Sequence, residues 1–280
     1  MKKNRIILLF LIVFTMIFSI IPTGVPQKGV YTFHGAAGDQ KILKVRTVNN
    51  ASLLALFGVN WTDVIEIFGP GAANVGARAK SVVTAVNFDF TLDLTLYGLG
   101  TYDACLYTTN NWQWTTEDFA ETPDATGTPT TSLYDPTNLT SIVNSLYLIY
   151  NVTVQNAAAY LAQLPTPVDQ YLGAIVWEPK WEAVGNTVVH NAAQFDILPD
   201  YINVKFYVYL QACTETWTYD TTYGAWIGYK LQDNADNVIY EFSIELPSPA
   251  AIPGYELLIL LGASAIGIIS LTYATIKKKR

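Results

Sequence analysis

The side chains that most often perform catalysis are few in this chain and widely spaced. It has two histidines, His34 and His190, which are too far apart in sequence to indicate a metal site or a histidine-dependent triad. It lacks the motifs of serine hydrolases, zinc proteases, P-loop proteins and dinucleotide-binding proteins. Asp89 and Asp93 share one phase of a predicted strand and could act as acid and base, although solvent-facing acids often have this spacing. We therefore expect no enzyme, no cofactor and no metal centre.

Oxygen-bearing side chains suited to calcium occur together in one segment, Asp233-Asn234-Ala235-Asp236-Asn237. Ca²⁺ prefers carboxylate and amide oxygens, but the segment lacks the glycine and the distal glutamate of an EF-hand loop. An Asx-rich turn between two strands explains it better.

Tryptophan side chains gather at three places where they could contact a ligand or a partner: Trp112 and Trp114, Trp177 and Trp181, and Trp217 and Trp226. Aromatic residues beside acids and amides can stack on sugars or anchor a protein. Cross-strand aromatic pairing is the structural alternative, and the sequence leaves both readings open.

The two cysteines, Cys105 and Cys213, each lie in a predicted strand. An even pair in an oxidising compartment favours a disulfide, which would close a loop of about 108 residues and stabilise the fold by about 3–5 kcal/mol. Two buried free thiols are the alternative.

The N-terminus has the pattern of an export signal. Lys2, Lys3 and Arg5 precede the sixteen mostly apolar residues Ile6–Ile21. This is typical of a secretory signal peptide, with an uncleaved signal anchor as the alternative.

The C-terminus has the pattern of a membrane anchor. The twenty residues Leu257–Ile276 carry no charge and would form a helix of about 30 Å, long enough to cross the hydrocarbon layer and contact membrane lipid. The basic cluster Lys277–Arg280 follows directly, so the positive-inside rule places the C-terminus in the cytoplasm. We expect a signal segment over residues 1–24, an extracellular domain over 25–250 and a single-pass anchor over 251–280.

The tail Pro253-Gly254-Tyr255, with the apolar span and the basic cluster behind it, resembles the C-terminal sorting or anchor signals of archaeal surface proteins. Two further segments, Phe57-Gly58-Val59-Asn60-Trp61 and Asn74-Val75-Gly76-Ala77-Arg78-Ala79-Lys80, resemble surface proteins of Asgard archaea. The resemblance implies a location at the cell surface and, in related systems, exchange of the tail for a lipid by a sortase-like protease. Tyr255 stands where those signals have phenylalanine.

Composition agrees with export of a folded domain. Of 280 residues, 51% are hydrophobic and only 14% are charged, which excludes a disordered chain. Residues 22–250 hold nine cations and 22 acids, a net charge of −13 that opposes binding to nucleic acid. Four N-x-S/T sequons, at Asn50, Asn60, Asn138 and Asn151, are candidate glycosylation sites.

Period-two alternation predicts long strands. The strongest run covers Val82–Tyr97, with Phe88, Phe90, Leu92 and Leu94 on the apolar face and Asn87, Asp89, Thr91 and Asp93 on the polar face. We also expect a strand over 41–48, another over 102–108, and short helices over 52–57 and 62–68.

The second half reads as a loop, a helix and a meander. Residues 109–136 are polar and turn-rich, and apolar spacing predicts a helix over 138–164. Residues 187–195 look like a strand, and a long strand over 202–219, with Phe206 and Val208 facing inward, precedes two hairpin-linked strands. The last of these strands should turn Tyr240 and Phe242 inward, sharing a buried face with Phe206, Val208 and the apolar face of the Val82–Tyr97 run.

These elements predict an α+β fold in which a long-stranded, curved, mostly antiparallel sheet wraps around the 138–164 helix. The expected role is that of a membrane-anchored surface protein with a structural or interaction function. The alternative is a module that binds a glycan or an apolar ligand on the concave face, which would need an aromatic-lined pocket of several hundred Å³.

Overall fold

The computed structural model describes residues 27–97, 99–139, 163–200 and 205–245. The chain divides into two compact units, Met1–Ser243 and Ile244–Arg280, and the first holds every described helix and all but the last residue of the described strands. The proposed signal segment and anchor, and Asn151, lie outside the described residues.

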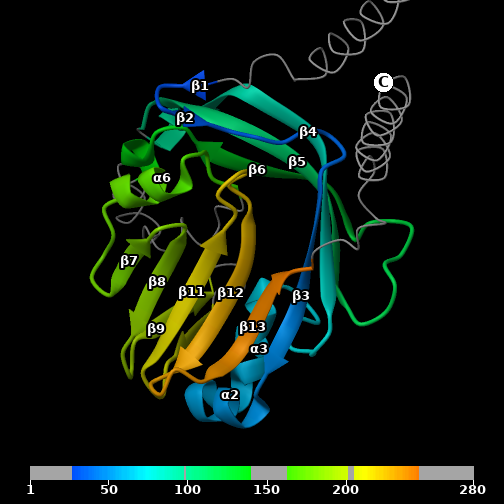
Figure 1. The fold of residues 1–280 in the computed structure, drawn as a ribbon, viewed down its shortest axis with the longest axis vertical. Coiled ribbons are helices and arrows are strands. Elements are labelled where there is room, and N and C mark those ends of the chain that lie inside the picture. Colours follow the sequence, from blue (N-terminus) through cyan, green and yellow to red (C-terminus); the bar gives the residue numbers. More distant parts are fainter. Residues whose placement is uncertain (1–26, 98, 140–162, 201–204, 246–280) are drawn as a thin grey trace, which may run out of the picture. The chain divides into compact units, whose positions relative to one another are not determined.

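A nine-stranded antiparallel sheet dominates the fold (Figure 1), with strand order β6-β5-β4-β3-β13-β12-β11-β8-β7. The strands are β3 (Gln40–Val48), β4 (Arg78–Asp93), β5 (Thr101–Thr115), β6 (Ala125–Leu133), β7 (Trp181–Val184), β8 (Thr187–Ala192), β11 (Cys213–Tyr219), β12 (Trp226–Asp233) and β13 (Val238–Ile244). Two small ribbons accompany it: β1 (Gln27–Lys28) with β2 (Tyr31–Thr32), and β9 (Ile197–Asp200) with β10 (Lys205–Val208).

Short helices complete the described residues. They are α2 (Asn50–Phe57), η1 (Gly58–Asn60), α3 (Trp61–Ile65), η2 (Glu66–Phe68), η3 (Thr95–Tyr97) and α6 (Val168–Ala174). Asn49 caps α2 by accepting a hydrogen bond from the Ser52 backbone N–H at 3.1 Å, as N-cap residues do. The strand over 41–48 and both short helices are thus confirmed. A sixteen-residue strand is also present, but it begins and ends four residues earlier than predicted, and Thr95–Tyr97 form a 3-10 helix instead of strand.

The sheet is curled rather than flat, as expected for long strands. Trp114 of β5 and Phe242 of β13 are separated by β4 and β3 in the strand order, yet their ring centroids are 5.2 Å apart. Phe68 of η2 contacts both of these strands. Its ring lies 5.1 Å from that of Phe242 on β13, and its carbonyl accepts a hydrogen bond from the indole N–H of Trp114 on β5. The α2–η2 segment (residues 50–68) therefore packs on the concave face.

The helix expected to cover that face cannot be compared, because it falls mostly in 140–162, outside the described residues. Residues 136–139 are helical. The one described helical stretch with the length and apolarity of a membrane span is Asn50–Phe68. It bends at Gly58 (φ 71°) and buries Leu53, Leu56 and Val64 in the sheet core, so we treat it as a core segment.

The expected loop over 109–136 is wrong. β5 continues to Thr115, and β6 forms over Ala125–Leu133. Pro129 suggested a loop because proline cannot donate to a sheet ladder, but β6 is the last strand of the sheet and an edge strand tolerates it. The threonines of this segment favour strand formation without requiring burial.

The inward phase predicted for β10 is also wrong. Phe206 and Val208 are 63% and 40% exposed, whereas Tyr207 and Tyr209 are buried. β10 and β11 are moreover separate strands, and β10 pairs with β9 outside the large sheet. Both phases of this run carry large rings, so alternation alone cannot choose between them.

The shared face predicted for β4 and β13 splits into two. Tyr240 and Phe242 are fully buried near Phe68, whereas Phe88 is only half-buried and packs with Phe33, Cys105, Tyr107 and Tyr134. The solvent-facing phase of β4 is confirmed, because Asn87, Asp89, Thr91 and Asp93 are all exposed.

The expected disulfide is not formed. Cys105 and Cys213 are free and buried. They belong to β5 and β11, which have β4, β3, β13 and β12 between them in the strand order. Burial raises the pKa of the Cys105 thiol to about 12, so it behaves as an apolar core group.

Two glycines provide a matched test of the close packing of Leu164 against the β11–β12 hairpin. Gly224 and Gly185 both have positive φ, at 72° and 59°, but a Cβ at Gly224 would overlap the backbone carbonyl of Leu164, whereas one at Gly185 meets nothing within 4 Å. We expect Gly185→Ala to lose about 1–2 kcal/mol from backbone strain alone, and Gly224→Ala about 3 kcal/mol or more. Urea unfolding of both variants measures the difference, and equal losses would contradict the close approach of residue 164 to the hairpin.

Candidate functional site

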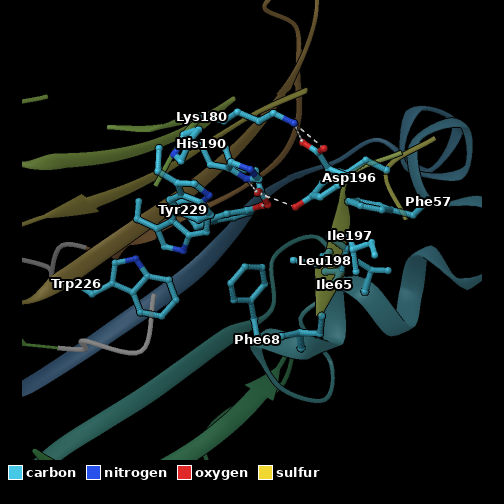
Figure 2. A pocket seen from close by; sticks show the side chains of 17 residues that line it. Phe57, Ile65, Phe68, Lys180, His190, Asp196, Ile197, Leu198, Trp226 and Tyr229 are labelled. Atoms are coloured by element: carbon cyan, nitrogen blue, oxygen red, sulfur yellow. Dashed lines mark hydrogen bonds and ion pairs between the residues drawn. The ribbon is translucent and has the colours of Figure 1, made fainter. Parts of the chain in front are cut away.

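A cavity of about 490 Å³ lies between the sheet, the α2–η2 segment and β9 (Figure 2). The sheet contributes only aromatic and polar side chains, whereas the aliphatic ones come from the α2–η2 segment and from β9. The lining residues are Trp181, His190, Glu215, Trp217, Trp226 and Tyr229 from the sheet, Phe57, Val64, Ile65, Ile67 and Phe68 from the α2–η2 segment, and Pro179, Lys180, Asp196, Ile197, Leu198 and Tyr209 from the β9 side and nearby turns.

Strand register brings the polar groups together. His190 is the cross-strand partner of both Trp181 and Glu215, so these three form one row across β7, β8 and β11. Trp217 and Tyr229 are partners in the next row on the same face. Because residues two apart share a face of a sheet, the two rows form a continuous wall of the cavity.

The centre of this wall is a buried carboxylate. Glu215 is 3% exposed, and its Oε1 accepts a hydrogen bond from the Tyr229 hydroxyl at 2.5 Å. Its Oε2 accepts from the Tyr209 hydroxyl at 2.8 Å and lies 2.7 Å from His190 Nδ1. Burying an acid costs several kcal/mol unless donors compensate it, and here three donors do so.

The two tyrosines stay protonated as donors. Burial, and then the negative charge of Glu215, raise the pKa of Tyr209 and of Tyr229 well above the ordinary value of 10.0. Backbone hydrogen bonds hold Tyr209 in place. Its N–H donates to the backbone carbonyl of Asp196, and the N–H of Leu210 donates to the backbone carbonyl of Leu56 near the end of α2.

Ring stacking fixes the histidine. The His190 imidazole lies on Trp181 with ring centroids 4.1 Å apart and planes 10° apart. Trp181 in turn stacks on Trp217 at 5.0 Å. The stack and the bond to Glu215 together hold one orientation of the imidazole, so His190 presents its other nitrogen, Nε2, in a fixed direction.

An ion pair between Lys180 and Asp196 lies at the rim of the cavity. Lys180 Nζ lies 2.6 Å and 2.7 Å from the two carboxylate oxygens of Asp196 (Figure 2). Partial burial raises the pKa of the Asp196 carboxyl, but hydrogen bonds from Lys180 and the Ala193 N–H outweigh burial and bring that pKa below its usual range. Behind the wall, Lys41 donates to the Trp226 carbonyl, and burial lowers its pKa to about 8.

Three of the six tryptophans proposed from the sequence meet at this cavity: Trp181, Trp217 and Trp226. The others are engaged elsewhere. Trp112 donates to the Ala120 carbonyl under the Lys80 ammonium, which lies 3.6 Å from its ring centroid. Trp114 is buried against Phe68, and Trp177 donates to the Leu172 carbonyl.

His190, Glu215 and Tyr209 were not proposed as site residues. Glu215 had a detectable signal, since it is an acid flanked two residues away on each side by Cys213 and Trp217, and all three are buried on one face of β11. An acid on the apolar phase of a strand indicates either a partner or a function.

The remaining candidates lie away from the cavity. Asp233 Oδ1 accepts from the Ala235 and Asn237 N–H groups at 2.9 Å, which is the Asx turn expected there. In the described part of the chain, no three His, Cys, Asp or Glu side chains are grouped to hold a metal ion. Asn50 and Asn60 are exposed, and Asn138 is half-buried.

No protein family, curated protein or solved structure matches this chain.

The buried carboxylate gives a testable stability effect. Glu215→Gln keeps the shape but places an amide N–H₂ where one oxygen now accepts, so that two donors face each other. We expect a loss of about 1–3 kcal/mol in the free energy of unfolding by urea. The matched control is Glu182→Gln on β7, where the side chain is exposed and the expected change is within about 0.5 kcal/mol. Equal losses of unfolding free energy in the two variants would mean that the hydrogen bonds from Tyr209, Tyr229 and His190 to Glu215 do not stabilise the fold.

Proposed function

We propose that this chain is an exported, membrane-anchored protein whose extracellular domain binds a small, largely apolar ligand in the cavity between the sheet and the α2–η2 segment. The observation that carries the proposal is the cavity of about 490 Å³ with aromatic side chains converging from β7, β8, β11 and β12. Sites for small molecules have volumes of about 300–1,000 Å³ and apolar walls with a few fixed polar groups.

A purely structural role fits this geometry less well. A structural domain gains from filling the space between its layers, because an unfilled cavity loses packing contacts. Here a cavity of about 490 Å³ remains between the sheet and the α2–η2 segment, beside the buried Glu215 carboxylate. Catalysis also ranks behind binding, since none of the lining residues is Ser, Thr or Cys, which leaves the His190–Glu215 pair without a nucleophile to activate.

An interaction role is the second candidate, and one observation favours it. The β9–β10 ribbon exposes large apolar side chains, with Ile197 and Phe206 at 62% and 63% exposure. Ile197 and Val208 are direct cross-strand partners, so these groups share a face. Contiguous exposed apolar groups are typical of contact surfaces.

Location is supported by the two ends of the sequence. The basic, apolar start, the uncharged Leu257–Ile276 and the terminal Lys277–Arg280 support export with the C-terminus inside.

Ligand binding is tested with a neutral naphthylamine dye whose emission rises in apolar surroundings. We expect saturable binding to the full-length chain, and an affinity at least about tenfold lower for Trp181→Ala, which opens one wall. Trp112→Ala is the matched control, because Trp112 lies outside the cavity and should leave the dye affinity unchanged. Equal dye affinity for Trp181→Ala and Trp112→Ala would mean that the dye binds outside this cavity.

Topology is tested with epitopes on either side of the anchor. One is inserted after the exposed Glu121, between β5 and β6, and the other follows Arg280. Protease added to intact cells should remove the first and spare the second. Protection of the Glu121 epitope would overturn the proposed location.

A further inference from the structure

Three ring nitrogens of the cavity wall lack a hydrogen-bond partner within the described residues: Nε2 of His190, Nε1 of Trp181 and Nε1 of Trp217. The only fully buried side-chain nitrogen or oxygen without a partner in those residues is Ser132 Oγ, so none of the three ring nitrogens is completely sealed from the cavity or solvent. Trp226 differs, because its indole N–H donates to the Gly228 carbonyl.

These nitrogens present a mixed pattern. An indole nitrogen can only donate a hydrogen bond. In the neutral imidazole one nitrogen carries the proton and the other accepts; since Nδ1 faces the Glu215 carboxylate, which already accepts from two tyrosines, Nδ1 is the donor and Nε2 is the acceptor. With His190 neutral, the wall therefore offers an acceptor at Nε2 together with donors on the two stacked tryptophans.

The charged groups of the lining are already engaged. Both oxygens of Glu215 accept hydrogen bonds, and Lys180 is paired with Asp196. The opposite wall, with Ile65, Phe68 and Leu198, is apolar (Figure 2). A ligand carboxylate would lose its hydration and be repelled by Glu215, and a ligand ammonium would lose its hydration for a carboxylate whose two oxygens already accept hydrogen bonds.

From this arrangement we infer that the cavity binds a neutral, apolar molecule through a single hydroxyl group. The hydroxyl donates its hydrogen to His190 Nε2 and accepts from the indole N–H of Trp217 or Trp181, while the hydrocarbon body packs against the apolar wall. A hydroxyl is the smallest group that both donates and accepts. A carboxylate would face the nearby Glu215 charge, an ammonium would bring three donors to one free acceptor, and a glycan would bring more hydroxyls than the lining can satisfy.

This inference rests on the proposed ligand-binding function, and one matched series separates the two. Tryptophan fluorescence of the full-length chain is titrated with cyclohexylmethanol, methylcyclohexane, cyclohexanecarboxylate and cyclohexylmethylamine. We expect the alcohol to bind about threefold to tenfold more tightly than the hydrocarbon, the gain from one or two hydrogen bonds, and both charged compounds to bind more weakly than the alcohol.

Two variants assign the hydroxyl contacts. Trp217→Phe keeps a ring in the wall but removes the N–H, and His190→Asn keeps a donor for Glu215 but removes Nε2. Each should reduce the alcohol's advantage over the hydrocarbon while leaving hydrocarbon affinity within about twofold. Trp112→Phe, outside the cavity, should leave the advantage intact. If His190→Asn fails to fold, Trp217→Phe and Trp181→Phe decide together, and an undiminished advantage of the alcohol in both variants overturns the hydroxyl inference.

The outcomes are distinct. Equal affinity for alcohol and hydrocarbon, or tighter binding of the acid or the amine, overturns the hydroxyl inference while the apolar cavity stands. Absence of saturable binding for all four compounds overturns both proposals.

Discussion

The neutralisation of one buried charge organises the cavity side of this molecule. Glu215 lies on β11, the third strand from the β7 edge, with almost no exposure to water, and its carboxylate is stable there only because donors reach it from three directions. Tyr229 comes from β12, His190 from β8, and Tyr209 from the chain just after β10. The requirement for these donors couples the register of three sheet strands to the position of the β9–β10 ribbon. A slip of one residue in any strand would turn a donor to the opposite face and leave the charge uncompensated.

The same cluster explains why a cavity exists beside it. Side chains that satisfy Glu215 must point toward it, so they line a wall instead of filling the space in front of them. Trp181 and Trp217 extend this wall by stacking, and the α2–η2 segment approaches from the other side with Phe68 and Ile65. The cavity thus combines a few fixed polar groups on one wall with apolar side chains on the other, as small-molecule sites commonly do.

Much of the fold was predictable where one physical signal dominates. β4 alternates cleanly, so its length and its exposed face follow from the pleat. Gly69 and Pro70 mark the end of the short helical segment. Prediction failed where the signal was ambiguous: Phe206 and Tyr207 are both large rings, and only the need of Glu215 for a donor at Tyr209 explains the observed phase. Pro129 and its threonine neighbours resemble a loop unless the strand is known to lie at the edge. The site was half predictable, because aromatic clusters are visible in sequence, whereas the His190–Glu215 pairing depends on a register that no local pattern specifies.

The open sheet has two free edges, and both are poor templates for growth. β7, at one edge, is only four residues long, and β6, at the other, contains Pro129, whose nitrogen cannot donate. Short edge strands and edge prolines are devices by which natural sheets resist pairing with neighbouring copies. Two copies of this domain that meet edge to edge would therefore contact each other through side chains and would not extend one another's backbone ladder.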